Sequence, residues 1–204
     1  QESRSVGITS AMSPVIDVSR DPRWGRTYET YGEDPYLISQ FGVEYVRAMQ
    51  AQGVSCIAKH FLGYAETQGG LNTAAARIND RELYETFATP FEAADKLAGL
   101  GGMMANYGEI DGLPVITNPR IARTLLRDTM GLEGMLTSDK LSKTYEEAGL
   151  LAKKGGCDTE ILVGAAFRSL PNYVRSGELD EAALDESVRR ILKIKFDMGL
   201  FENP

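Results

Sequence analysis

The chain has 204 residues, with 22 Lys and Arg against 29 Asp and Glu, which gives a formal net charge of −7 and an isoelectric point of about 4.9. An acidic chain lacks the basic surface that binds nucleic-acid phosphates or anionic membranes, so neither is expected as a partner. Hydrophobic residues make up 43% and charged residues 25%, which is typical of a globular protein with a substantial core. The chain begins at Gln1 without a recognisable leader, and we interpret it as a piece of a longer protein.

Membrane-spanning and metal-binding classes are also disfavoured. No apolar run reaches the roughly 18 residues of a transmembrane helix. Cys56 and Cys157 lie far apart in apolar segments, without the spacing of a disulfide scaffold or a metal site, so both are expected to be buried. His60 is the only histidine, which argues against His-rich metal catalysis.

Short apolar runs alternate with longer amphipathic segments. Each run is short enough for a strand that is buried on both faces. The five predicted strands are Ala11 to Asp17, Ser55 to Phe61, Gly101 to Tyr107, Met135 to Asp139 and Cys157 to Leu162.

The segments between these runs carry helix start signals. Asp34-Pro35, Asn118-Pro119 and Asp180 are each typical of a helix N-terminus, and Leu179 with Leu184 forms a hydrophobic staple at the last one. The last helix has an apolar stripe formed by Leu184, Val188, Ile191, Leu192 and Phe196.

Two further helix starts are predicted from capping boxes. A helix that opens at Asp80 is expected to break at Pro90, with Thr89 and Glu92 as the capping box of a second piece. Thr144 and Glu147 form another box.

The alternation of strand and helix, without a hairpin signal such as Asn-Gly, predicts a parallel sheet with right-handed crossovers. About five strand-like units are present, whereas an eight-fold barrel usually needs about 250 residues. We therefore expect an α/β fold that is either an open sheet or about five-eighths of a (β/α) barrel, with residues 1–204 as one partial domain.

Polar residues lie in the closing part of the predicted strands: Asp17, Lys59-His60, Asn106-Tyr107, Ser138-Asp139 and Asp158 to Glu160. Parallel strands open on one face at their carboxyl ends, where barrels and open sheets place their active sites. The sequence therefore gathers carboxylates, a lysine, the only histidine and a phenol on one face, a composition typical of a catalytic site.

Structural roles remain open for each of these residues. Asp139 could cap a loop, Lys59-His60 could be a satisfied, partly buried pair, and Tyr107 could serve packing. Arg26 and Trp24 could form a rigid turn in which the guanidinium stacks on the indole. The glycine pairs do not match a phosphate-binding loop, which disfavours a nucleotide site.

Six motifs occur in a characteristic order along the chain. They are Asp21-Pro22-Arg23-Trp24-Gly25-Arg26, Tyr28 to Pro35, Lys59-His60-Phe61, Met104 to Tyr107, Gly134 to Asp139, and Val188 to Phe201. Together they resemble glycoside hydrolase family 3, the β-glucosidase and β-xylosidase group. The resemblance covers nearly the whole chain, and its most specific elements are the Asp-Pro-Arg-Trp-Gly-Arg and Lys-His-Phe motifs.

The resemblance implies a retaining glycosidase on a barrel-like domain. Asp139 would match the nucleophile that forms a glycosyl-enzyme. Arg26, Lys59 and His60 would match the residues that hold the hydroxyls of the terminal sugar, with Met104 and Tyr107 lining the same subsite. No metal or cofactor is implied, and the Lys59–His60 peptide is expected to be cis, as is frequent in the family.

Departures from the family pattern limit what the chain is expected to do alone. Retention needs a second carboxyl group as acid and base, which in this family comes from a later domain or a special loop. Leu62-Gly63-Tyr64 replaces the sequence of the branch that uses a His-Asp pair, and Lys140 stands where relatives have a stacking aromatic residue. The first barrel strands and their sugar-binding Asp-Gly motif are also expected to lie outside the chain.

Two other functions stay open at this stage. The chain could be a non-catalytic carbohydrate-binding or structural remnant, which Lys140 and the absent acid/base favour. An unrelated barrel enzyme such as an aldolase could instead use Lys59 to form an imine with a carbonyl substrate.

Overall fold

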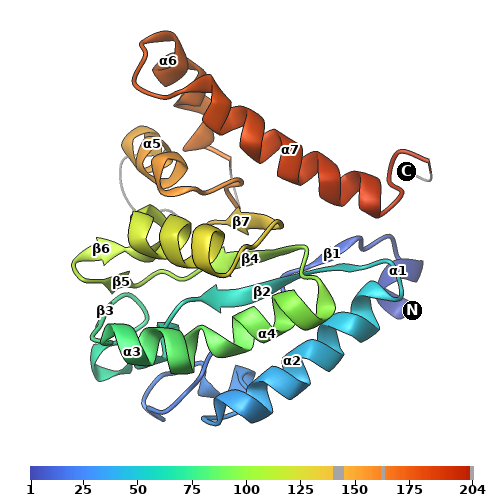
Figure 1. Ribbon diagram of the computed structural model, residues 1–204, viewed down its shortest axis with the longest axis vertical. Helices are drawn as coiled ribbons and strands as arrows, with labels where there is room; N and C mark the ends of the chain where they lie inside the picture. The colour runs from blue at the N-terminus through green and yellow to red at the C-terminus, as the bar shows by residue number, and fades with distance from the viewer. Residues whose placement is uncertain (140–144, 162–163, 203–204) are drawn as a thin grey trace.

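The computed structural model describes residues 1–139, 145–161 and 164–202 as an open, parallel α/β sheet with helices packed against it. The four strands β1 (Ser10–Ala11), β2 (Ser55–Phe61), β4 (Gly102–Ala105) and β7 (Met135–Thr137) lie in chain order, and each neighbouring pair is parallel (Figure 1). The predicted α/β class and incomplete barrel are thus confirmed, and the described strands do not close on themselves.

The helices fall between and after the strands. The α-helices are α1 (Glu2–Ser5), α2 (Pro35–Gln50), α3 (Asp80–Glu82), α4 (Thr89–Ala98), α5 (Tyr145–Gly155), α6 (Leu170–Arg175) and α7 (Glu181–Asp197). Two π-helical segments span Leu83–Phe87 and Arg120–Thr129, and short 3-10 turns span Thr27–Glu29, Tyr64–Glu66, Gln68–Gly70, Val115–Thr117 and Phe167–Ser169.

The first and last predicted strands are shorter than expected. The first is β1 plus an isolated parallel bridge between Val15 and Lys59. The last is a single parallel bridge between Thr137 and Thr159, while Leu162 lies outside the described residues. The Lys59–His60 peptide is cis, as expected.

A small second sheet corrects the expectation that the chain has no hairpin. Strands β5 (Glu109–Ile110) and β6 (Leu113–Pro114) are antiparallel, and β5 also pairs with β3 (Ala75–Ala76). The two residues of the turn, Asp111 and Gly112, have φ angles of 56° and 77°. Asp-Gly favours this two-residue turn because both positions need positive φ, so the signal was present in the sequence.

Most helix starts form as the sequence predicts. The Asp34 carboxylate accepts hydrogen bonds from the backbone N–H groups of Tyr36 and Leu37, and Asp180 caps α7 through the N–H of Ala182. The helical run bends at Ala88, just before Pro90, as expected.

The two capping boxes have different outcomes. The box at Thr89 is wrong, because its hydroxyl donates to the Glu85 carbonyl at 2.8 Å and no side chain caps α4. The box expected at Thr144 lies outside the described residues.

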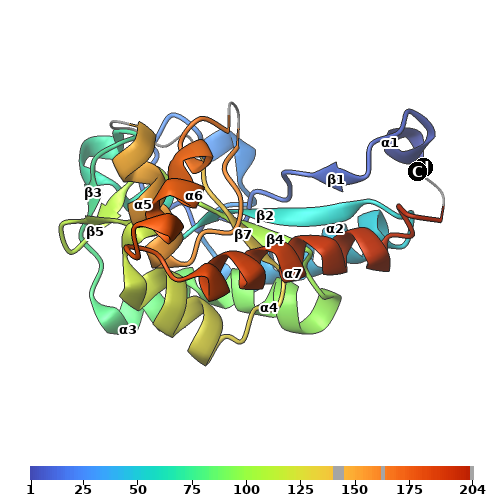
Figure 2. The same ribbon diagram turned by 90° about the horizontal axis from the view of Figure 1, so that it is seen from above.

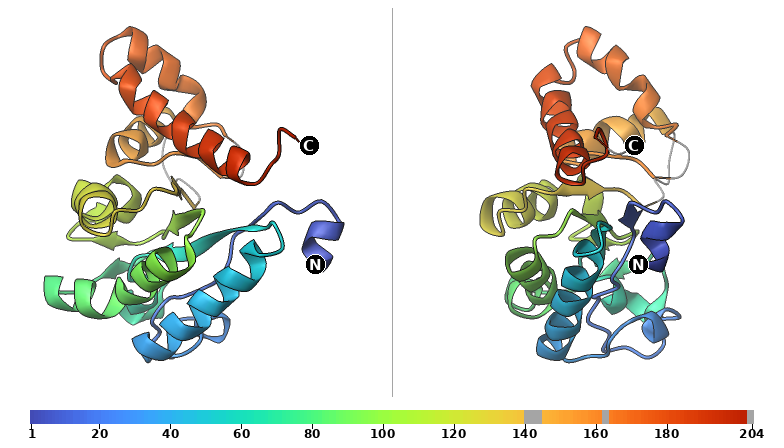
Figure 3. Two further views of the ribbon diagram at one scale, coloured as in Figure 1. Left: turned by 45° about the vertical axis from the view of Figure 1, so that its right-hand side comes forward. Right: turned by 90° about the vertical axis from the view of Figure 1, so that its right-hand side faces the viewer.

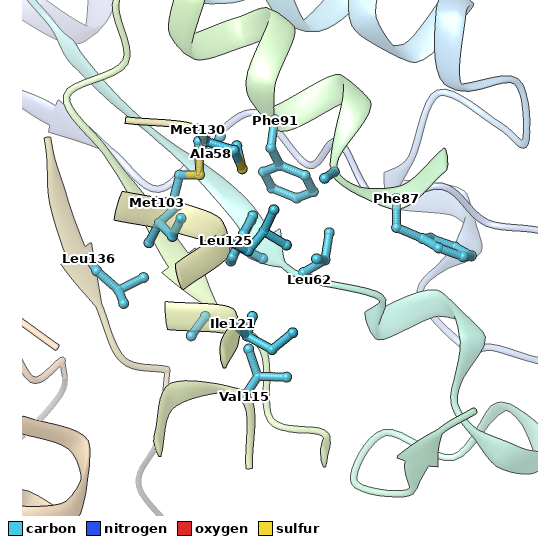
Figure 4. Packing of buried hydrophobic residues seen from close by; sticks show 14 of the residues in the cluster. Ala58, Leu62, Phe87, Phe91, Met103, Val115, Ile121, Leu125, Met130 and Leu136 are labelled. Carbon is cyan, nitrogen blue, oxygen red and sulfur yellow. The ribbon is translucent and has the colours of Figure 1, made fainter. Parts of the chain in front are cut away.

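The core lies between the sheet and its helices. Figure 3 shows α2 and α4 side by side on one face of the sheet. Figure 4 shows side chains from β2, β4, β7, α4 and the second π-helical segment meeting in one cluster. Cys56 and Cys157 are buried and unpaired, as predicted.

The last helix contributes less to this core than its pattern suggests. Val188, Leu192 and Phe196 are 52%, 38% and 57% exposed.

Helix α1 and the C-terminal end of α7 both lie at the end of the molecule where the parallel strands begin (Figures 1 and 2). Among the described residues, no helix is both long and apolar enough to span a membrane.

One buried carboxylate joins α7 to the sheet. Asp158 Oδ2 accepts hydrogen bonds from the Arg127 guanidinium at 2.7 Å and the Leu136 N–H at 2.8 Å. Its Oδ1 accepts from Ser187 at 2.6 Å and Arg190 at 3.0 Å. The Asp158 side chain is fully buried, and the Lys153 ammonium lies 4.0 Å from Oδ1 as a third positive charge. These partners neutralise the buried carboxylate, which holds β7, α7 and the second π-helical segment together.

Replacing Asp158 with Ala is expected to lower the free energy of unfolding by about 3–5 kcal/mol, because two guanidinium groups lose their buried counter-charge. Urea denaturation followed by circular dichroism measures the change. Asp128→Ala, at an exposed position of the same π-helical segment, should change the free energy of unfolding by less than about 0.5 kcal/mol. Equal effects of the two substitutions would contradict a special role for Asp158.

Candidate active site

The strand register places two of the predicted site residues, one from β2 and one from β4, next to each other in the sheet. Lys59 in β2 lies opposite Met104 in β4, and Met104 lies opposite Thr137 in β7. Met103 belongs to the core beneath the helices (Figure 4). Because side chains alternate along a strand, Met104 and its register partners face the opposite side of the sheet, away from that core.

The other polar residues at the strand ends come one to three positions after this row along the chain. Asp17, His60, Tyr107 and Asp139 therefore lie at one edge, where the parallel strands end. Hydrogen bonds stabilise the loops that carry these residues. Asn106, for example, donates to the Leu62 carbonyl at 2.5 Å and accepts from a neighbouring backbone N–H.

His60 is oriented by a buried carboxylate. Asp17 Oδ2 lies 3.0 Å from the backbone nitrogen of His60 and 2.9 Å from its ring Nδ1, and both side chains are 1% exposed. With Nδ1 donating to the carboxylate, Nε2 is left as the ring atom able to meet a ligand.

Arg26 is held in a two-pronged ion pair. Its Nε and one terminal nitrogen donate to the two carboxylate oxygens of Glu29 at 2.6 and 2.7 Å. The hydrogen bonds from Arg26 lower the pKa of Glu29, and the nearby charges of His60 and Lys59 add to this shift. A bidentate pair fixes the guanidinium plane and leaves its other terminal nitrogen available for further hydrogen bonds.

A small aromatic cluster connects these groups. Trp24 and Tyr64 are buried, and Tyr107 packs against them. The Tyr64 ring centroid lies 5.0 Å from that of Trp24, 5.0 Å from that of His60 and 5.8 Å from that of Tyr107, all in edge-on arrangements. The Arg26 guanidinium carbon lies 5.6 Å from the same centroid.

Tyr107 connects this cluster to Asp139. Burial and a hydrogen bond to the Asp139 carboxylate raise the pKa of the Tyr107 hydroxyl to about 12. The strand end that carries Asp139 is itself fixed, because the Ser138 N–H donates to the Thr159 carbonyl at 3.0 Å. The geometry thus forms a continuous chain of contacts from Asp17 through His60, Tyr64 and Tyr107 to Asp139.

The predicted site residues are therefore brought together at one edge. Arg26, His60 and Tyr107 each contact the Tyr64 ring, Tyr107 in turn contacts Asp139, and Lys59 is close enough for its charge to act on Glu29. Met104 is 4% exposed and sits in the same row as Lys59.

Two residues of this arrangement were not predicted. Glu29 follows Arg26 by three positions, a spacing that could have suggested an ion pair. Tyr64 had no comparable signal, since its ring partners come from distant segments. Among the described residues, no group of three or more His, Cys, Asp or Glu side chains is arranged to hold a metal ion.

A separate cleft lies away from these residues. It has a volume of about 570 Å³ and is lined by Ser55, Gly101 and Gly134, which precede or begin the strands, and by α7 residues including Arg190. It therefore opens at the opposite end of the sheet from Asp139 and is not part of the candidate site.

The family is decided by the match to a known domain. The model of the glycosyl hydrolase family 3 N-terminal domain matches residues 1–194. The chain belongs to glycoside hydrolase family 3. The chain of contacts that connects Arg26 and His60 through Tyr64 and Tyr107 to Asp139 thus occurs in a family 3 domain, in the segments that carry the sequence resemblance.

Similar proteins extend well beyond the matched region. A putative β-xylosidase of Formosa agariphila is 35% identical over 100% of this chain and 30% of its own length. A β-glucosidase structure from Erythrobacter marinus matches with a TM-score of 0.94 and 35% identity over 100% of this chain and 29% of its own. A β-glucosidase structure from Listeria innocua in complex with glucose matches with a TM-score of 0.90 and 32% identity over 96% of this chain and 30% of its own.

The raised pKa of Tyr107 predicts a pH dependence of stability. The hydroxyl titrates near pH 10 in the unfolded chain and near pH 12 in the folded protein, so the folded protein binds this proton more tightly. The stability that Tyr107 contributes is full below about pH 10 and is lost as the pH rises through about 12.

Urea denaturation of wild type and Tyr107→Phe at increasing pH measures this effect. The difference in free energy of unfolding should shrink as the pH rises above about 10. Tyr28→Phe, at a side chain that is 84% exposed, is the control and should show no such trend. A constant difference for Tyr107→Phe across this range would contradict the raised pKa.

Proposed function

We propose that this chain carries the nucleophile and the glycone-binding residues of a retaining glycosidase that removes terminal β-linked glucose- or xylose-type sugars. The observation that supports this most directly is the contact chain ending at Asp139, which joins a carboxylate to an arginine, a histidine and a phenol at one strand edge. The names of the relatives, a β-xylosidase and two β-glucosidases, support the sugar class.

Asp139 would act as the nucleophile. One carboxylate oxygen attacks the anomeric carbon as the bond to the leaving oxygen breaks, which forms a glycosyl-enzyme that water later hydrolyses. The Tyr107 hydroxyl, as a hydrogen-bond donor to this carboxylate, would hold it in one orientation for attack.

Arg26, Lys59 and His60 would bind the sugar hydroxyls. Glu29 fixes the plane of the Arg26 guanidinium through two of its donors, and a donor on the other terminal nitrogen would bind a hydroxyl. Asp17 holds the His60 ring so that Nε2 is available as an acceptor. Met104, in register with Lys59, would line the apolar side of the same subsite.

The complete reaction needs a second carboxyl group about 5–5.5 Å from the nucleophile. We propose that it comes from a further domain, that further barrel strands complete residues 1–204 as a barrel domain, and that neither metal nor cofactor takes part. The fraction of the relatives' length that the chain spans, about 30%, supports further segments. The alternative, a carbohydrate-binding remnant without catalysis, is an outcome of the test below.

Incubation with a 2-deoxy-2-fluoro glucoside bearing a dinitrophenolate leaving group should label the peptide that contains Asp139. Dinitrophenolate departs without protonation, so this substrate tests the nucleophile without the acid. Mass spectrometry of the intact and digested protein measures the adduct.

Asp139→Asn is the matched control and should give no adduct. A folded wild-type protein that forms no adduct, or one that is labelled on another peptide, would contradict the assignment. Sugar binding without labelling would favour the carbohydrate-binding alternative.

Turnover should depend steeply on the leaving group. Dinitrophenolate release from the matching glucoside without fluorine should be detectable. Methyl β-glucoside should react at least about a hundredfold more slowly, because its methoxide leaving group must be protonated by a general acid as it departs. Chromatographic measurement of the released glucose gives both rates. Equal rates for the two substrates would show that this chain contains its own acid.

A further inference from the structure

We propose that Tyr64 is a positioning residue, whose buried ring is the shared support that fixes Arg26, His60 and Tyr107 in the orientation that binds the sugar. The proposal rests on the proposed glycosidase function and adds to it a residue that does not itself touch the substrate. Its side chain has a relative exposure of 0%, so it acts through its neighbours.

The contacts of Tyr64 reach three separate segments. Arg26 comes from the loop after β1, His60 from the end of β2, and Tyr107 from the loop after β4. Their charged or aromatic groups lie 5.6, 5.0 and 5.8 Å from the Tyr64 ring centroid. Edge-on aromatic pairs and a guanidinium over a ring face have preferred geometries, so one fixed ring limits all three side chains at once.

The backbone before Tyr64 determines where its ring lies. Gly63 has a φ of 74°, a conformation that favours glycine, and a Cβ at this position would lie 2.6 Å from Ile78 Cδ1. The chain therefore turns tightly after β2 and begins the 3-10 turn that carries Tyr64. The Trp24 ring also contacts Tyr64, with the two ring centroids 5.0 Å apart.

The ring, rather than the hydroxyl, carries the proposed role. The Arg26 guanidinium lies beside the buried Tyr64 hydroxyl and acts against the rise in the hydroxyl's pKa that burial causes. Removing the hydroxyl therefore affects Arg26 alone, whereas removing the ring takes the common support from all three neighbours.

Three variants distinguish the effect of losing the Tyr64 ring from that of losing its hydroxyl and from general destabilisation of the fold. Tyr64→Phe keeps the ring, and Tyr64→Met fills a similar volume without it. Phe91→Met is the matched control, because Phe91 is equally buried and its ring makes an edge-on contact with Phe61 of β2 at 5.3 Å, away from the site.

Two measurements compare each variant with the wild type. The first is the concentration dependence of labelling by the 2-deoxy-2-fluoro dinitrophenyl glucoside. The second is the magnetic resonance signal of the imidazole ring, which belongs to one residue because His60 is the only histidine. The second readout needs no activity.

Tyr64→Met should raise the half-saturating glucoside concentration about tenfold or more and shift the His60 ring signals, because small misplacements of binding groups weaken recognition strongly. Phe91→Met should stay within about twofold of wild type in labelling, and Tyr64→Phe should lose clearly less than Tyr64→Met because only its interaction with Arg26 changes. Both variants should keep the His60 signals near the wild-type positions. This pattern would support the proposal.

Wild-type behaviour of Tyr64→Met in both readouts would overturn it, as would a loss in Tyr64→Phe equal to that in Tyr64→Met. If Tyr64→Met does not fold, the result for Tyr64→Phe still decides whether the hydroxyl is dispensable. Absence of labelling in the folded wild type would refute the proposed function, and the His60 signals would then decide separately whether Tyr64 orients that ring.

Discussion

The parallel register between β2 and β4 is the constraint on which the rest of the site depends. It sets Lys59 opposite Met104, and through β4 it sets Thr137 in the same row. Residues that follow this row must then end at one edge, although they are separated by dozens of positions along the chain. A shift of one residue in β2 would turn Lys59 toward the helices and the apolar Ala58 toward the site.

Buried carboxylates hold the two sides of the sheet. Asp17 fixes the His60 ring near the first strand, and Asp158 joins Arg127 and Arg190 near the last. A buried charge is stable only when hydrogen bonds and counter-charges replace water. The candidate site lies between these two anchored regions, which explains how short strands can present polar side chains in a defined arrangement.

Local sequence signals predicted the framework well. The apolar runs gave the core of each strand, and Asp34 and Asp180 cap their helices as their positions indicate. The Asp111-Gly112 turn could have been predicted from the same kind of signal. Local rules succeed here because capping and turn geometry involve neighbours in the chain.

Other features depend on contacts that local patterns do not contain. The capping box at Thr89 failed because its hydroxyl finds the Glu85 carbonyl of the preceding turn. The role of Tyr64 follows from Arg26 and Tyr107, which are about forty residues away on either side. For the same reason the stripe of α7 predicted an apolar face but not how much of that face is covered.

The most direct test of this account is a crystal structure of the chain after reaction with the 2-deoxy-2-fluoro glucoside. The account predicts a covalent bond between an Asp139 carboxylate oxygen and the anomeric carbon. It also predicts nitrogen atoms of Arg26, Lys59 and His60 within about 2.6–3.2 Å of sugar hydroxyls. A sugar bound at another edge of the sheet, or one that contacts none of these side chains, would contradict it.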